Sequence, residues 1–144
     1  MIKIENVSKA FREKIVLSKI SFTANEGEVT ALIGPNGSGK STLLKILLGL
    51  ISTDEGRATF DGKNYGELGK YPFRYVGTFL DSFQPNPTRT AYNHLRWIAL
   101  TSGISKQRCL ECLKIVGLQD VGNKKIKDYS LGMKQRLGLA TAIL

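Results

Sequence analysis

A glycine-rich stretch that ends in a lysine and two hydroxyl residues offers the clearest chemistry in this sequence. It runs from Gly34 to Thr42 and fits the phosphate-binding loop pattern G-x-x-x-x-G-K-[ST] at every specified position. Glycines let successive N–H groups point inward around anionic oxygens, Lys40 adds a positive charge, and the Ser41 hydroxyl suits Mg²⁺. The residues expected to contact a triphosphate are Gly34, Pro35, Asn36, Gly37, Ser38, Gly39, Lys40, Ser41 and Thr42.

The segments on either side of this loop have the composition of a strand and a helix. Residues 29–33 are apolar and β-branched like a buried parallel strand, and residues 43–50 are a leucine-rich run of helix formers. A helix that starts at the loop turns its unpaired N–H groups and its positive dipole end toward phosphate. A plain glycine turn between two core elements is the alternative, but the complete motif favours phosphate binding.

Alternating residues and turn signals make the rest of the first third β-rich. We expect strands at residues 2–7, 20–24 and 57–60, and a further strand at residues 75–80. Phe11 lies in the expected loop after the first strand, where its ring could stack on a nucleobase. An isolated aromatic residue is more often an ordinary packing residue, so this role stays open here.

The second half of the chain has helical patterns. Two prolines exclude a helix over residues 81–89, and helices are expected at residues 91–100 and 106–116. Ser105 is the expected N-cap of the second helix, and a last helix begins near Ser130. The sequence therefore predicts an α/β protein of the phosphate-loop NTPase fold, with a β-rich N-terminal part and a helical subdomain.

The composition is that of a globular chain of 144 residues with a formal net charge of +9. Such a charge raises the question of nucleic acid or anionic lipid. The basic residues are scattered apart from Lys124, Lys125 and Lys127, and no aromatic residues are interleaved with them. We interpret them as a solvated face and expect no nucleic-acid partner. The sequence shows no secretory signal and no apolar run of about 18 residues that could span a membrane.

The cysteines and the single histidine favour structural roles. Cys109 and Cys112 form one C-x-x-C without a second pair or nearby histidines, so we expect two buried or half-buried thiols on one helix face rather than a zinc or redox site. No Cys, Asp or Ser is placed to make His94 a triad member or a metal ligand, so we expect it to pack or to lie on a helix surface.

A second informative stretch runs from Ser130 to Arg136 and reads Ser-Leu-Gly-Met-Lys-Gln-Arg. Together with the glycine loop it resembles the ATP-binding subunit of ABC transporters, whose signature is usually L-S-G-G-Q followed closely by Q-R. Leu131 and Met133 stand where the family has its second-position glycine and its glutamine. The positions that match the family pattern are Ser130, Gly132, Gln135 and Arg136.

The resemblance covers the whole chain and implies roles for further residues. Phe11 has the place of the family's adenine-stacking aromatic residue. Asp81 has the place of the Q-loop glutamine, where a carboxylate could reach Mg²⁺ together with Ser41. Gln84 lies three residues late for that role. An acidic residue at this place, with Ser-Leu-Gly-Met in the signature, resembles the branch that includes exporters of antimicrobial peptides and bacitracin-type self-protection.

The resemblance also implies an ATPase that uses Mg²⁺ and converts ATP and water to ADP and phosphate. Two ATPase subunits would meet head to tail, with each ATP between one glycine loop and the partner's Ser130 and Gly132. A transmembrane permease subunit would follow this cycle, which places the protein peripherally on the cytoplasmic, inner face of the cell membrane. The family's Walker B aspartate and switch histidine have no counterpart before Leu144, so we expect an N-terminal fragment that is inactive alone.

The expected organisation has three parts. Residues 1–86 form the nucleotide-binding core, residues 87–136 form a helical subdomain that ends in the signature, and residues 137–144 begin a truncated core helix. Two other functions stay open: another phosphate-loop enzyme, such as a GTPase or a small-molecule kinase, and a soluble ABC protein that acts on nucleic acid or ribosomes. The guanine-reading N-K-x-D is not matched at residues 123–126, which argues against a GTPase.

Overall fold

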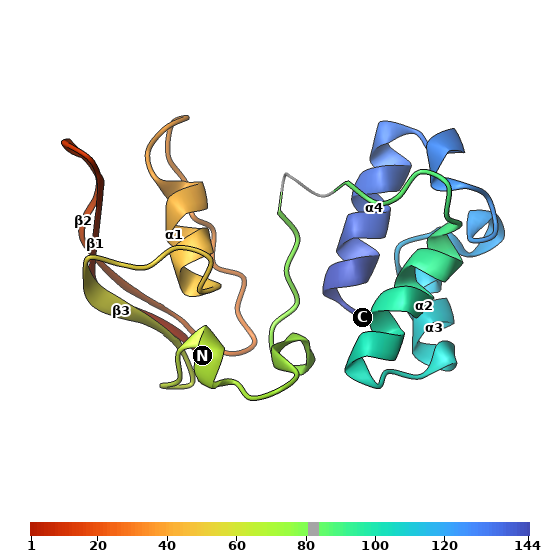
Figure 1. Cartoon of the computed structure of the whole chain (residues 1–144), viewed down its shortest axis with the longest axis horizontal. Helices are drawn as coiled ribbons and strands as arrows, with labels where there is room; N and C mark the ends of the chain where they lie inside the picture. Colours follow the sequence, from red (N-terminus) through yellow and green to blue (C-terminus); the bar gives the residue numbers. More distant parts are fainter. Residues whose placement is uncertain (81–83) are drawn as a thin grey trace. The chain divides into compact units, whose positions relative to one another are not determined.

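The computed structural model describes residues 1–80 and 84–144, and these form two compact units, Met1–Pro72 and Phe73–Leu144 (Figure 1). The expected boundaries after residues 86 and 136 remain predictions. Among these described residues, short 3₁₀ turns accompany the strands and helices, namely η1 (Tyr65–Glu67), η2 (Pro72–Arg74), η3 (Gln119–Val121) and η4 (Ile126–Asp128).

The first unit is built on a three-stranded antiparallel sheet. β1 (Ile2–Phe11) is the central strand, with β2 (Lys14–Ala24) on one side and β3 (Glu55–Phe60) on the other. A tight hairpin joins β1 to β2, because Phe11 pairs with Lys14. The expected strands at residues 2–7, 20–24 and 57–60 are confirmed, each as part of a longer strand.

One helix completes the first unit. α1 (Lys40–Leu47) begins at the end of the glycine loop and ends three residues earlier than the run of helix formers predicts. Its buried side chains lie on one face at helical spacing, as expected for a helix that packs against a sheet. The buried hydrophobic residues of this unit are Ile4, Val7, Leu17, Leu43, Ile46, Leu47, Ala58 and Phe60.

Two of the expected strands are wrong. Residues 29–33 and 75–80 have no strand structure, and the apolar side chains of Val29 and Ile33 are 101% and 89% exposed. A strand forms by hydrogen bonding to a neighbour, and no segment among the described residues pairs with either of these two. An apolar, β-branched composition therefore indicated a preference for burial that this structure does not satisfy.

The second unit is helical. α2 (Ala91–Ser102), α3 (Lys106–Ile115) and α4 (Leu131–Ala142) each begin after a hydroxyl N-cap that accepts a backbone hydrogen bond. All three helices are confirmed, and Ser105 is the N-cap of α3 as predicted. Residues from all three helices share one core. Its fully buried members include Ala91, Leu95, Ala99, Cys109, Cys112, Leu118, Ile126, Leu137 and Ala140.

Within residues 1–80 and 84–144, no helix is both long and apolar enough to cross a bilayer.

Candidate functional site

The glycine loop has the backbone shape that its sequence predicts. Gly37 and Gly39 have φ values of +83° and +91°, in the left-handed region that residues with a Cβ rarely adopt. Gly39 is also the N-cap of α1, and its carbonyl accepts the Leu43 amide at 2.9 Å. The loop therefore leads directly into the positive end of a helix dipole, which favours a bound anion.

The Lys40 side chain folds back over this loop. Its ammonium Nζ donates to the carbonyl oxygens of Gly34 at 2.7 Å and Pro35 at 2.8 Å. The Ser38 amide donates to the Pro35 carbonyl at 3.2 Å, which closes a tight turn. The positive charge is thus held at the loop by main-chain acceptors. Ser41, next along α1, is exposed.

The glycine loop packs against the β1–β2 hairpin. A Cβ on Gly39 would lie 2.7 Å from Leu17 Cδ2 and 2.9 Å from the Val16 carbonyl oxygen, so the loop packs directly on β2. Phe11 belongs to the same hairpin, two pairs nearer the turn than Leu17. The expected loop position of Phe11 is wrong, because this residue is the last of β1; its side chain is 46% exposed.

Lys9 is a residue of this region that the sequence reasoning missed. Its ammonium lies 5.5 Å from the centroid of the Phe11 ring and 2.5 Å from Asp54 Oδ1. The Ala10 amide donates to the other oxygen of Asp54 at 2.7 Å, and the Lys9 and Ala10 hydrogen bonds hold the pKa of this carboxyl below its usual value. Alternation along a strand places Lys9 and Phe11 on one face, which was the available signal.

The signature stretch lies at the start of α4 in the second unit. Ser130 is the N-cap, and its hydroxyl oxygen accepts the Met133 amide at 3.3 Å. Ser130 and Gly132 are exposed, and Leu131 is 74% exposed. No heavy atom of the described residues lies within 4 Å of where a Cβ on Gly132 would be, apart from its own helix and neighbours. The first turn of α4 is thus exposed at Ser130, Leu131 and Gly132, while the Met133 amide is bonded to the cap.

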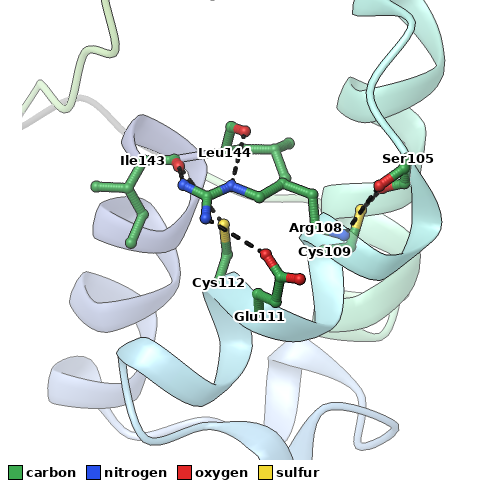
Figure 2. Close-up of polar contacts among 7 residues, drawn as sticks. All are labelled: Ser105, Arg108, Cys109, Glu111, Cys112, Ile143 and Leu144. Carbon is green, nitrogen blue, oxygen red and sulfur yellow. Dashed lines mark hydrogen bonds and ion pairs between the residues drawn. The ribbon is translucent and has the colours of Figure 1, made fainter.

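The other residues that the sequence singles out are Asp81, Gln84, His94 and the two cysteines. Asp81 lies outside the described residues, and Gln84 is exposed. His94 is buried in the helical unit, where burial and then the charge of Arg89 lower its pKa; the packing role expected for it is confirmed. Both cysteines are buried free thiols of α3, as the sequence predicted (Figure 2), and burial raises their pKa values.

Two transport ATP-binding proteins match this chain over its whole length. The lantibiotic transport ATP-binding protein SrtF of Streptococcus pyogenes is 35% identical over 100% of this chain and 62% of its own length. The bacitracin transport ATP-binding protein BcrA of Enterococcus faecalis is 37% identical over 100% of this chain and 47% of its own length. The chain thus spans about half to two thirds of these relatives.

Solved structures agree on the architecture. The dimeric structure of MJ0796, a bacterial ABC transporter cassette, has a TM-score of 0.83 at 31% identity, covering 99% of this chain and 68% of that one. The ADP conformation of MJ1267, an ATP-binding cassette of an ABC transporter, has a TM-score of 0.84 at 27% identity, covering 99% and 64%. The phosphate-loop NTPase fold expected from the sequence is therefore confirmed.

A family model decides the membership. The model described as ABC transporter matches residues 17–144, which include the glycine loop, α1 to α4 and the signature stretch. The chain therefore belongs to the ABC transporter family.

Proposed function

We propose that this chain is the ATP-binding part of an ABC-type transporter ATPase. The observation that carries the proposal is the glycine loop at the start of α1, where two left-handed glycines and the Lys40 ammonium form a site for phosphate oxygens. The loop amides would bind the α- and β-phosphates, and Lys40 would exchange its two carbonyl acceptors for phosphate oxygens. Similarity to two named transport ATP-binding proteins over the whole chain supports ATP as the nucleotide.

The residues beside the loop fit the rest of the ligand. The exposed Ser41 hydroxyl is an oxygen donor of the kind Mg²⁺ prefers, and Asp81 is the second expected metal contact. Mg²⁺ would neutralise charge on the phosphates. The exposed ring of Phe11 would stack on adenine, and the nearby Lys9 ammonium would keep that ring in place by its cation–π contact. No residue of this chain is assigned to activating the attacking water.

Completion of the site would require a second ATPase subunit. Ser130 and Gly132 are exposed at the N-terminus of a twelve-residue helix, so a γ-phosphate bound to another subunit's loop could approach them. Nucleotide binding would then close a head-to-tail dimer, and hydrolysis to ADP and phosphate would remove the anion between its halves. The dimeric cassette among the similar structures supports this arrangement.

The transport step is assigned to a membrane partner. We propose a transmembrane permease subunit, with this protein peripheral on the cytoplasmic face of the membrane. The named relatives transport a lantibiotic and bacitracin, which supports a peptide or antibiotic as the exported substrate.

Nucleotide titration tests the binding proposal. Lys40→Ala should lower the affinity of the full-length gene product for fluorescent ATP with Mg²⁺ by at least about tenfold, because it removes a charge-assisted contact. Lys45→Ala is the matched control, since it removes an exposed lysine from the same helix. Equal affinities of Lys40→Ala and wild type would refute the proposal. Sensitivity of the source cells to lantibiotics and bacitracin after gene deletion then tests the substrate class.

A further inference from the structure

The aromatic ring at the end of β1 is in contact with an ion pair that involves a residue far along the chain. The Lys9 ammonium lies over the Phe11 ring, 5.5 Å from its centroid, and 2.5 Å from Oδ1 of Asp54. Lys9 and Phe11 belong to β1, whereas Asp54 is the residue directly before β3. The contact therefore connects the ring to the neighbouring strand of the sheet.

Asp54 acts where β1 loses its β3 neighbour. Pairing between these two strands ends where Ser8 lies opposite Glu55. Beyond that point the Asp54 amide donates to the Ser8 carbonyl at 3.0 Å, and Asp54 Oδ2 accepts the Ala10 amide at 2.7 Å. Both carboxylate oxygens are thus in use, one on the backbone of β1 and one on the Lys9 side chain.

The Lys9 side chain has little access to water. It is 11% exposed, whereas the Asp54 side chain is 45% exposed. An ammonium group that is removed from water needs a charged partner, because burial of an unpaired charge is costly. The hydrogen bonds of Lys9 and then Ala10 lower the pKa of the Asp54 carboxyl, so this partner is ionised at neutral pH. Without the carboxylate, the ammonium would turn toward solvent and leave the Phe11 ring.

We propose that Asp54 and Lys9 are positioning residues for the stacking of adenine on Phe11. The carboxylate fixes the ammonium, and the ammonium fixes the orientation of the ring before nucleotide binds. The inference rests on the proposed function, because it concerns the base on which Phe11 would stack. A half-exposed ring that is not held in place can change rotamer, and ordering it on binding lowers the affinity.

The test compares two ligands that differ in the base. Calorimetric titration of the full-length gene product measures its affinity for ATP and for inorganic tripolyphosphate, both with Mg²⁺. Asp54→Asn keeps an oxygen for the Ala10 amide but removes the charge. It should raise the dissociation constant for ATP about threefold and leave that for tripolyphosphate unchanged. Glu55→Gln is the matched control, since it removes one negative charge from the next residue, which is also exposed, and should change neither constant.

The second ligand separates positioning from a general loosening of the hairpin. The β1–β2 hairpin packs against Gly39 of the glycine loop through Val16 and Leu17. A variant that loosened the hairpin would therefore disturb the phosphate site, and it would weaken the binding of ATP and tripolyphosphate together. A variant that only releases the Phe11 ring should affect the ligand that carries a base.

Variants of Lys9 test the same contact from the other side, and they serve if Asp54→Asn does not fold. Lys9→Met should weaken ATP binding about as much as Asp54→Asn, and the double variant should show little further loss, because both changes release the same ring. Lys9→Arg keeps a cation over the ring and should bind ATP more tightly than Lys9→Met. Lys19→Met is the control, since it removes an exposed lysine from the same hairpin.

Three results would overturn the inference while the proposed function stands. They are wild-type affinity of Asp54→Asn for ATP, an equal loss for ATP and tripolyphosphate, and additive losses in the double variant. Phe11→Ala tests the stacking contact itself, and wild-type affinity of that variant for ATP would refute the proposed role of the ring. The Lys40→Ala titration tests the phosphate site separately.

Discussion

At the scale of single residues, Gly39 is the position where backbone shape and space both exclude a side chain. Its φ of +91° costs a residue with a Cβ about 1–2 kcal/mol. A Cβ would also meet the Val16 carbonyl at 2.9 Å, and backbone cannot move aside easily. Gly39→Ala should therefore destabilise the first unit and weaken ATP binding. Urea unfolding and nucleotide titration measure the two effects.

Gly62 provides the control for this prediction. It has a φ of +79°, but nothing lies within 4 Å of its Cβ position, so Gly62→Ala carries the backbone cost alone. The difference between the two variants isolates the overlap with β2. Equal losses of unfolding free energy would show that the hairpin does not support the loop.

His94 predicts a pH dependence of the helical unit. Burial, followed by the charge of Arg89, lowers its pKa from the ordinary value of 6.5, so the folded state favours the neutral imidazole. The unfolded chain therefore binds a proton at a higher pH than the folded chain does. The contribution of neutral His94 to the free energy of unfolding is fully present above pH 6.5 and is lost as the pH falls below that value. Thermal unfolding between pH 7.5 and 5.5 should show this slope.

The same measurement on His94→Gln is the decisive comparison. The sequence contains a single histidine, so no other imidazole titrates in this window. The slope should disappear in the variant, whatever its absolute stability. A slope that persists unchanged would assign the pH dependence to other groups.

At the scale of elements, the helices were predictable from sequence and two strands were not. The N-caps of α2, α3 and α4 act within three residues, so Ser105 and Ser130 could be recognised locally. A strand depends on a partner far along the chain, which composition does not reveal. The prediction of strands at residues 29–33 and 75–80 is wrong for this reason.

The candidate site also has one part that the sequence predicted and contacts that it did not predict. The glycine loop is contiguous, so its residues and its turn were read directly from the motif. The packing of Gly39 on β2 depends on hairpin register, and the contact of Arg136 with Val116 depends on how two helices pack. Neither leaves a pattern in the sequence. Both are long-range contacts that only the structure provides.

Two N-caps of the same type give a prediction about elements. Ser130→Ala and Ser105→Ala each remove a hydroxyl that accepts an amide at 3.3 and 3.2 Å, so each should cost about 1 kcal/mol of unfolding free energy. Only Ser130→Ala should also weaken ATP-dependent dimerisation. Chemical denaturation and sedimentation separate the two effects. Equal dimerisation of both variants would make Ser130 a cap and nothing more.

At the scale of the whole molecule, the two units have separate cores. The first is enclosed by the sheet and α1, and its members include Ile4, Val7 and Leu17; the second is formed by α2, α3 and α4 around residues such as Leu95 and Leu137. The predicted phosphate contacts divide between them, with the glycine loop in one and the signature turn in the other. Nucleotide binding and signature placement should therefore respond to different core mutations.

Leu137→Ala tests this division. Leu137 is fully buried in the helical core, so the truncation should cost about 2–5 kcal/mol through lost burial and the cavity that remains. Hydrogen exchange should show lost protection in α2, α3 and α4, while the paired amides of β1 and β2 and the affinity for ATP keep their wild-type values. Leu139→Ala is the control, because Leu139 lies on the same helix and is 50% exposed. Loss of protection throughout the sheet would mean that the two cores unfold as one cooperative unit.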